Sequence, residues 1–168
     1  LAVVEIPNVT HIPISEENPI TLMLDAIRDP GNLGTIIRAA DWFNIKSIVC
    51  SEDTVDIYSP KVIQATMGSF LRTNVSYCDL KQYLEQTKSQ THVYGSFLNG
   101  KPLNTVSPQF PAIIIIGNES IGISESLNPY ISEQTCIPKL NKSQNNPDSL
   151  NAAIATSILA YHFTNHLK

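Results

Sequence analysis

The sequence has few charged residues, few cysteines and no long apolar run. Only 15% of its 168 residues are charged, and acidic residues outnumber basic ones to give a formal net charge of −4. This acidity argues against a domain that binds nucleic acid by bulk electrostatics, so affinity for RNA should be weak or local. No apolar stretch approaches the roughly 20 residues needed to cross a bilayer, and no signal peptide is visible. We therefore expect a soluble, cytoplasmic protein with no membrane contact.

Cysteines and histidines are too scattered to form a metal site. The three cysteines, Cys50, Cys78 and Cys136, have no metal-ligand spacing, and they fall in predicted strands. We expect reduced thiols in the core of a cytosolic protein. The four histidines share no spacing typical of metal ligands either. The sequence therefore predicts a function that needs no metal.

Strand-like and helix-like segments alternate along the chain. Strands are predicted at residues 1–6, 20–26, 47–50, 75–78, 92–97, 112–117 and 135–138. Helices are predicted at residues 33–43, 60–69, 80–87, 124–131 and 149–165. This alternation predicts an α/β fold with a mostly parallel sheet and helices on both faces, in one domain that spans residues 1–168.

Residues 29–38, with the sequence DPGNLGTIIR, combine a strand end, a glycine-rich turn and a helix start. Asn32 is a good helix cap. Arg38 follows Gly34 by one helical turn on the same face, so its guanidinium is expected to reach back over the bare glycine. A cation beside the positive end of a helix attracts phosphate or a developing oxyanion. For this segment alone, an exposed helical arginine after an ordinary turn is an equal alternative.

Two later segments place polar groups at the end of a strand and at the start of a helix. The apolar run 112–116 stops at Gly117-Asn118-Glu119, a pattern typical of a central parallel strand that leads into a polar loop. Open α/β sheets bind ligands at such loops. Pro147, Asp148 and Ser149 then give a strong helix-start signal for the last predicted helix.

In this order the three segments resemble the three motifs of the SpoU family of RNA ribose 2′-O-methyltransferases, within the SPOUT superfamily. The matching positions are Asn32, Gly34 and Arg38, then Gly117, Asn118 and Glu119, and finally Ser149, Leu150 and Asn151. The resemblance spans nearly the whole chain, but residues 139–148 form a longer link than the family usually has, without glycine. It implies the SPOUT fold with a C-terminal trefoil knot, S-adenosylmethionine as methyl donor and a homodimer that completes the active site.

The resemblance also implies roles for individual residues. Arg38 would orient a substrate phosphate and stabilise negative charge, or act as a base if its pKa were strongly lowered, and the sequence leaves both open. Asn32 and Glu119 would hold Arg38 and the ribose, while Ser149 and Asn151 would position the substrate. The pocket for S-adenosylmethionine would be lined by Leu98, Gly117, Asn118, Ile137 and Leu150.

The expected substrate is structured RNA, with ribosomal RNA preferred to transfer RNA. Many members of the family carry a small RNA-binding domain before their catalytic domain, and this chain begins with leucine. The resemblance therefore implies a fragment that lacks an N-terminal RNA-binding domain. An apolar stripe on the last predicted helix is either core or dimer contact.

Three other functions fit the sequence less well. Residues 95–101 have P-loop spacing as far as Lys101, but Pro102 stands where a Ser or Thr must bind magnesium. A non-catalytic RNA-binding module would not need the combined motif residues, and the Asn-x-Gly-x-x-x-Arg signature favours ribose over a base as the methyl acceptor. Trp42 is expected in the core rather than on a base-stacking surface.

Overall fold

The structure is a computed structural model that describes residue 5, residues 13–141 and residues 149–167. Within this part, six strands form one sheet in the order β3-β2-β1-β5-β4-β6. Their bounds are β1 (Ile20–Leu24), β2 (Ser47–Cys50), β3 (Asn74–Tyr77), β4 (His92–Pro102), β5 (Ala112–Ile116) and β6 (Glu133–Cys136). Every neighbouring pair runs parallel, which confirms the predicted parallel α/β fold.

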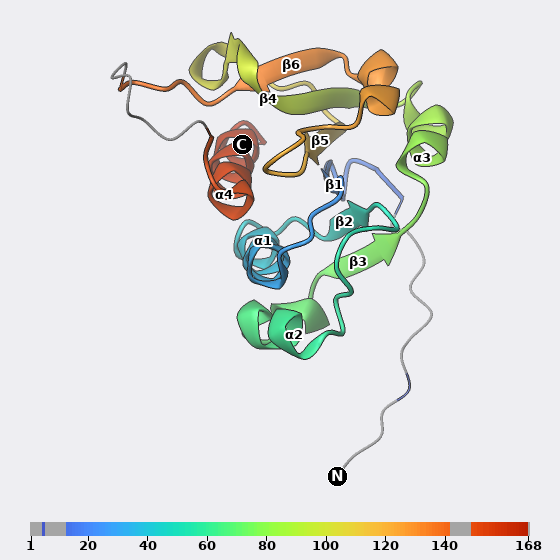
Figure 1. Cartoon of the computed structure of the whole chain (residues 1–168). Helices are drawn as coiled ribbons and strands as arrows, with labels where there is room; N and C mark the ends of the chain where they lie inside the picture. Colours follow the sequence, from blue (N-terminus) through green and yellow to red (C-terminus); the bar gives the residue numbers. More distant parts are fainter. Residues whose placement is uncertain (1–4, 6–12, 142–148, 168) are drawn as a thin grey trace.

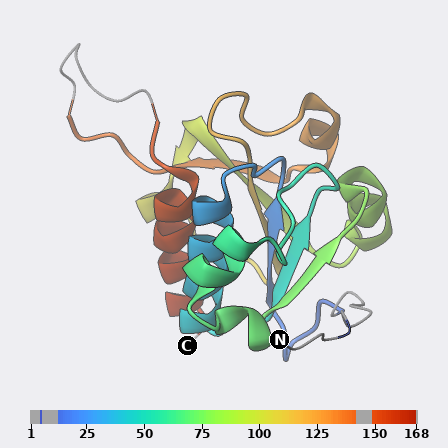
Figure 2. The same cartoon turned by 60° about the horizontal axis from the view of Figure 1, so that its bottom comes forward.

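Helices cover both faces of the sheet (Figure 1). The elements are α1 (Pro30–Trp42), α2 (Pro60–Thr66), α3 (Leu80–Thr87) and α4 (Ala152–Asn165), with short 3₁₀ turns η1 (Ser69–Leu71), η2 (Leu103–Thr105) and η3 (Glu125–Tyr130). Helices α4, α1 and α2 lie side by side on one face, as Figure 2 shows, and α3 with η3 covers the other. The sheet is therefore buried between two layers.

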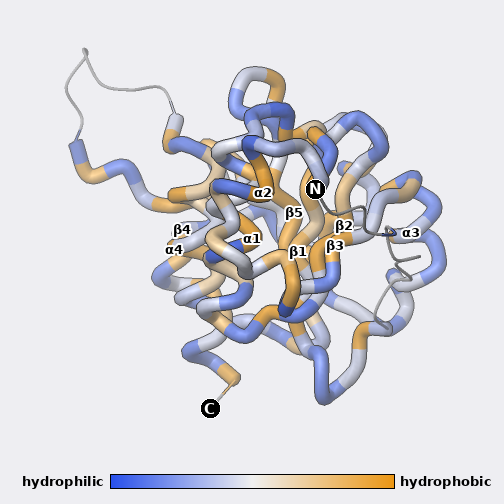
Figure 3. Tube along the Cα trace, turned by 90° about the horizontal axis from the view of Figure 1, so that it is seen from below, coloured by the Kyte–Doolittle hydropathy of each residue, from blue (hydrophilic) through white to orange (hydrophobic). Residues whose placement is uncertain are grey.

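Burial on both faces explains why the two central strands are almost entirely apolar, with Thr21 of β1 as their one polar residue. Side chains alternate across a strand, so Leu22 and Leu24 face the core under α1 and α4, whereas Met23 faces the core under α3. Neighbouring β5 repeats the pattern, with Ile114 in the first core and Ile113 in the second. Figure 3 shows β1 and β5 as hydrophobic segments in the middle of the molecule. Such strands need mostly apolar residues on both faces.

Helix α1 begins earlier than the sequence predicted, and a different residue caps it. Pro30 occupies the first turn, where a missing N–H costs nothing. The Oδ1 of Asp29 accepts a hydrogen bond of 2.7 Å from the backbone N of Asn32. The prediction that Asn32 caps the helix is therefore wrong. Asn32 lies inside the first turn, and its side chain is left to reach other elements.

Gly34 serves helix packing rather than an anion site. It is buried where α1 meets α2, and a Cβ atom at this position would collide with the side chain of Ala65 on α2. The prediction that the Arg38 guanidinium reaches back over an uncovered Gly34 is therefore wrong, because α2 already covers that side of α1. Glycine at this position allows the two helices to approach closely.

Local backbone geometry shortens two of the predicted helices, the one at 60–69 at its end and the one at 149–165 at its start. Met67 and Gly68 have left-handed φ values of 51° and 86°, so α2 stops at Thr66. Asn151 caps α4, which therefore begins at Ala152. The predicted helix at 124–131 is the 3₁₀ turn η3. Strand β2 and helix α3 have the predicted bounds.

Two sequence predictions fall outside the described residues. The strand at 1–6 does so except for Glu5, which belongs to no strand. Residues 142–148, within the link between β6 and α4, are also outside this part, so the trefoil knot stays a prediction. In the part of the chain that the structure describes, no helix has both the length and the apolar character needed to span a bilayer.

Candidate active site

A tight loop after β5 carries Glu119 at the carboxyl edge of the sheet. Two backbone hydrogen bonds close this loop, from Asn118 N to Gly122 O at 3.1 Å and from Gly122 N to Asn118 O at 2.8 Å. Gly117 packs directly against the backbone of Gly122, so a side chain at Gly117 would open the loop. Gly122 itself has a φ of 74°, which favours glycine. These backbone contacts close the loop on itself.

Asn118 shapes this loop with its side chain as well. Its Oδ1 accepts hydrogen bonds from Ser120 N at 2.9 Å and Ile121 N at 3.3 Å. Its Nδ2 donates to the carbonyl oxygen of Ala26, at the end of β1, at 2.9 Å. These bonds give Asn118 a structural role. The predicted contact between Asn118 and a cofactor stays a prediction.

Three predicted site residues from three distant segments form one hydrogen-bonded chain. The side-chain Nδ2 of Asn151 donates to Oδ1 of Asn32 at 2.7 Å. The Nδ2 of Asn32 in turn donates to Oε1 of Glu119. The start of α4, the first turn of α1 and the loop after β5 therefore meet at one point. We call Asn151, Asn32 and Glu119 the amide chain.

The cap of α4 sets the direction of the amide chain. The Oδ1 of Asn151 accepts from Ala153 N at 3.0 Å and Ile154 N at 3.3 Å, so this oxygen is committed to the helix end. Only the NH₂ group of Asn151 is left to face Asn32. Asn32 must then present its oxygen to Asn151 and its NH₂ group to Glu119. An ionised Glu119, which only accepts hydrogen bonds, fits this position.

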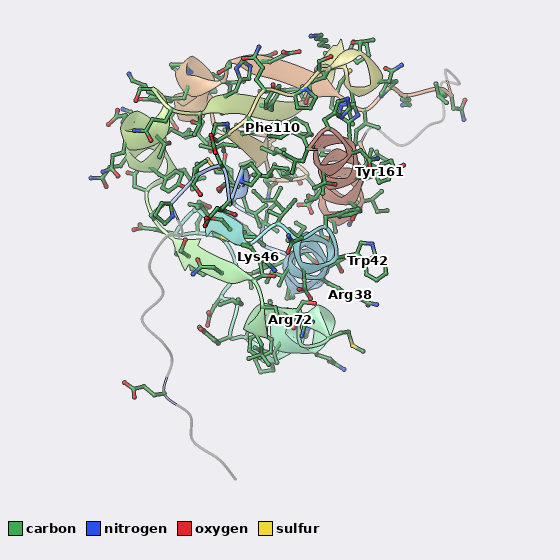
Figure 4. All side chains as sticks on the ribbon, turned by 180° about the vertical axis from the view of Figure 1, so that it is seen from behind. Arg38, Trp42, Lys46, Arg72, Phe110 and Tyr161 are labelled. Atoms are coloured by element: carbon green, nitrogen blue, oxygen red, sulfur yellow. The ribbon has the colours of Figure 1, made fainter. Side chains whose placement is uncertain are left out.

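Arg38 does not join the amide chain within one protomer. It follows Asn32 by six positions on α1, which turns it about 240° around the helix axis. Arg38 is exposed and, among the described residues, makes no ion pair or hydrogen bond. Figure 4 shows it projecting from the outer side of α1, on the same side as Trp42 of α1 and Tyr161 of α4.

Helices α1 and α4 carry exposed apolar side chains. Trp42 is 84% exposed, so the prediction that it lies in the core is wrong. The buried side of α1 carries Ile36 and Ile37 and faces the sheet, whereas Trp42 points away from it. The apolar side chains exposed on and beside α4 are Leu150, Ile154, Ile158 and Tyr161. We call these four residues with Trp42 the outer face.

The segments predicted to hold the cofactor begin at neighbouring strand ends. Strand β4 lies between β5 and β6, and Leu98 lies within β4, where the pairing with β6 shifts its register between Ser96 and Lys101. Leu98 is 69% exposed and Leu150 is 46% exposed, while Ile137 packs partly against the core. Ser149 is exposed and, among the described residues, has no hydrogen bond to Asn32 or Glu119. Apolar side chains are thus available for an adenosine group.

An acidic cavity of about 400 Å³ lies at the carboxyl edge, and Asp25, Glu52, Asp53, Cys78, Asp79 and Ser124 are part of its lining. A hydrogen bond from Ser51 lowers the pKa of Asp53, aided by Arg28. Burial and the nearby Asp79 raise the pKa of Cys78 to about 11. The cavity therefore holds an anionic Asp53 and a neutral Cys78 thiol near pH 7, and its acidic lining would repel RNA phosphates.

The cysteines and the groups that could bind a metal bear on two of the sequence predictions. Cys50, Cys78 and Cys136 are all free, but only Cys50 is fully buried. Within the described ranges, no group of three or more His, Cys, Asp or Glu side chains could hold a metal ion.

Comparison with known proteins gives a consistent family assignment. A family model described as the SpoU rRNA Methylase family matches residues 19–161. The 23S rRNA (guanosine(2553)-2'-O)-methyltransferase RlmP of Bacillus subtilis is 33% identical over 94% of this chain and 64% of its own length. The mitochondrial rRNA methyltransferase 1 of Saccharomyces cerevisiae is 27% identical over 84% of this chain and 40% of its own.

A solved structure is similar in fold and sequence. The AdoMet-bound rRNA methyltransferase from Sinorhizobium meliloti has a TM-score of 0.81 and 30% sequence identity. The match covers 95% of this chain and 59% of that one. The chain thus spans less than two thirds of the length of each of these relatives.

Proposed function

Because the chain belongs to the SpoU rRNA methylase family, we propose that it transfers a methyl group from S-adenosylmethionine to a ribose 2′-hydroxyl of ribosomal RNA. The amide chain carries this proposal, because it joins one residue from each of the three motifs. Two relatives support it by name, RlmP as a 2′-O-methyltransferase of 23S rRNA and the Sinorhizobium enzyme as an AdoMet-bound rRNA methyltransferase.

The residues at the carboxyl edge fit S-adenosylmethionine. Leu98 and Leu150 offer exposed apolar surface for its adenosine, and the close packing of Gly117 leaves backbone rather than side chain at the end of β5. Ile137 lies at the matching end of β6. When bound, S-adenosylmethionine supplies an electrophilic methyl carbon on a positively charged sulfur.

The ribose hydroxyl needs help, because it is a weak nucleophile at neutral pH. Its oxygen forms the new bond to carbon while the sulfur–carbon bond breaks, and its proton leaves to a base or to water. Aligning the hydroxyl and stabilising the developing negative charge both lower the barrier. Glu119 has acceptor capacity beyond its bond with Asn32, so it can hold the ribose. The amide chain fixes the position of that carboxylate.

Arg38 supplies the positive charge. An arginine stays protonated near neutral pH, and its planar guanidinium matches a phosphate group. Since Asn32 and Arg38 point to different sides of α1, the cation reaches the amide chain from Arg38 of the partner subunit. A ribose and its neighbouring phosphate would then lie between two protomers.

A homodimer through the outer face would bring Arg38 to that position. Exposed apolar residues from α1 and α4 lie on the side from which Arg38 projects. Contiguous exposed apolar patches mark interaction sites in soluble proteins. A second copy of the chain would bury both patches and complete two active sites at once.

RNA affinity would rely partly on segments that this chain does not contain. The net charge is −4, and the acidic cavity adds repulsion at the carboxyl edge. We therefore propose that a separate RNA-binding segment supplies part of the affinity for RNA. The free cysteines fit a reducing compartment. We therefore propose that the protein is cytoplasmic, although one relative is mitochondrial.

Methyl transfer to defined RNA tests the proposal. The protein is incubated with S-adenosylmethionine labelled in its methyl group and with ribosomal RNA from cells that lack the gene. We expect labelled 2′-O-methylribose at one position, found after nuclease digestion and mass spectrometry. Label on a base would mean that the enzyme methylates a base and not the ribose. Binding of RNA without any transfer would instead support the non-catalytic alternative.

A further inference from the structure

Asp25 is a buried carboxylate directly after β1, and the sequence motifs do not include it. With 5% of its surface exposed, it is the one Asp, Glu, Lys or Arg among the described residues that is buried. A buried carboxylate destabilises a fold unless it is hydrogen-bonded. Its bonding partner therefore indicates what Asp25 does.

The bonds of Asp25 hold both ends of the loop that carries Glu119. Its backbone N donates to the carbonyl oxygen of Ile116 at 2.9 Å, where the loop leaves β5. Its side-chain Oδ2 accepts from the backbone N of Ser124 at 2.6 Å, where the loop enters η3. The second bond is charge-assisted and short, and such bonds are stronger than neutral ones.

The residue that follows Asp25 makes this anchor rigid. Ala26 has a left-handed φ of 57°, which is unfavourable for a residue with a side chain. Its N donates to Oγ of Ser51 at 2.8 Å, and its carbonyl oxygen accepts from Asn118. Strand ends β1 and β2 therefore hold the turn in place, and the loop of Glu119 is attached to that turn.

We infer that Asp25 is a positioning residue for the proposed methyl transfer, because it fixes the loop that presents Glu119 to Asn32. Asp25 makes no hydrogen bond to Asn32, Glu119 or Asn151 among the described contacts, so it acts through the loop. Without the bond to Ser124, the loop keeps its attachment at Asn118 but loses the one at its far end. The inference rests on the proposed function, since Glu119 is its point of action.

Two variants remove the same bond from opposite sides. Asp25→Ala removes the acceptor. Ser124→Pro removes the donor, and Ser124 already has a φ of −57°, which proline adopts without strain. Asp25→Asn keeps an oxygen that can accept from Ser124 N. Glu52→Ala removes an exposed carboxylate from the same cavity and serves as the charge control.

Methyl-transfer kinetics test the inference. We expect Asp25→Ala and Ser124→Pro each to lower kcat at least about tenfold, the scale for a displaced catalytic group, with little change in the KM for RNA. The double variant should lose no more than either single one, because both remove one bond. Asp25→Asn should recover most of the activity, and Glu52→Ala should match the wild type. Independent, additive losses, or full activity in Asp25→Ala, would overturn the inference.

Hydrogen exchange separates this inference from the proposed function. Amides at 117–124 should exchange faster in Asp25→Ala than in the wild type, while amides of β1 and β5 stay protected. If the wild type transfers no methyl group, the proposed function fails, yet faster exchange in the variant still shows that Asp25 holds the loop. Unchanged exchange at 117–124 contradicts the inference whatever the activity. Should Asp25→Ala not fold, Ser124→Pro and Asp25→Asn give the same comparison.

Discussion

The side-chain NH₂ of Asn151 donates to the side-chain oxygen of Asn32 across 2.7 Å and 119 positions of sequence. This bond joins the cap of α4 to the first turn of α1. Because Asn151 also caps α4 with its oxygen, one residue sets both the start of a helix and the orientation of an amide in the site. Stability and activity should therefore respond differently to changes at this position.

Asn151→Asp should separate these two roles. Aspartate caps helices as well as asparagine does, so the melting temperature should change little. Its second oxygen would face Oδ1 of Asn32 and turn that amide around, which places an oxygen against Glu119. We expect methyl transfer to fall about a hundredfold, the scale for losing a positioned catalytic group.

A matched variant controls for the added charge. Asn165→Asp places the same new carboxylate at the exposed far end of α4, and it should keep wild-type transfer. Normal activity in Asn151→Asp, measured with the same RNA, would mean that the amide orientation is unimportant for the reaction.

Arg38→Ala should lower methyl transfer by about a hundredfold or more while leaving the fold and the affinity for S-adenosylmethionine intact. Arg38 is exposed and makes no bond within the described part of its own protomer, so its loss should not disturb packing. Calorimetry with S-adenosylmethionine and a transfer assay measure the two effects. Lys46→Ala, which removes an exposed cation just after α1, is the control. Equal losses in both variants would indicate general electrostatics instead of a specific role.

The fold could be predicted from the sequence because its signals are local. The buried strands β1 and β5 need apolar residues on both faces, and that requirement is visible as the unbroken hydrophobic stretch of β5 and the nearly unbroken one of β1. The family, too, was predicted from three motifs and is confirmed by the match over residues 19–161. Helix ends were harder, because Met67 adopts a left-handed backbone that no local pattern indicates.

The site was predicted only in part. Asn32, Glu119 and Asn151 were expected together, and the structure brings them together. The orientation of their amides was not predictable, because it depends on which atom caps α4. Gly34 and Trp42 were misinterpreted for a related reason. A sequence shows which face of a helix is apolar but not which neighbour fills it, and α2 lies against Gly34 while no described residue covers Trp42. The one sequence feature that could have indicated Asp25 is an acidic residue directly after an apolar strand.

Ile154→Glu should convert the proposed homodimer into monomers. Ile154 is exposed on the outer face of α4, and a buried, unpaired carboxylate there would oppose association. Sedimentation at micromolar concentration should give a mass near the 18.5 kDa of one chain, and transfer should fall because Arg38 no longer reaches the partner's site. Leu71→Glu changes a more exposed apolar residue near α2 and should stay dimeric. A wild-type monomer that transfers methyl groups would contradict the shared site.

Arg72→Gln should lower the melting temperature at pH 7 but not at pH 2. Arg72 bonds both carboxylate oxygens of Asp41, with Nε donating to Oδ1 at 3.2 Å and Nη2 donating to Oδ2 at 2.6 Å, and this holds the pKa of Asp41 below its usual value. A lowered carboxyl pKa stabilises the fold above the unfolded value of about 4, and the effect is lost as Asp41 becomes protonated at lower pH. Calorimetric scans across this range measure the difference. A constant difference from pH 7 to pH 2 would mean that packing, and not charge, explains the effect.

The long separation between Asn32 and Asn151 also bears on when the protein becomes competent. During translation the first motif emerges well before the residue that completes the amide chain has been made. Contacts between distant positions form late, because a long loop must close first. A nascent chain that ends soon after Glu119 therefore has its first two motifs but no complete amide chain, so the site is not assembled until α4 has docked.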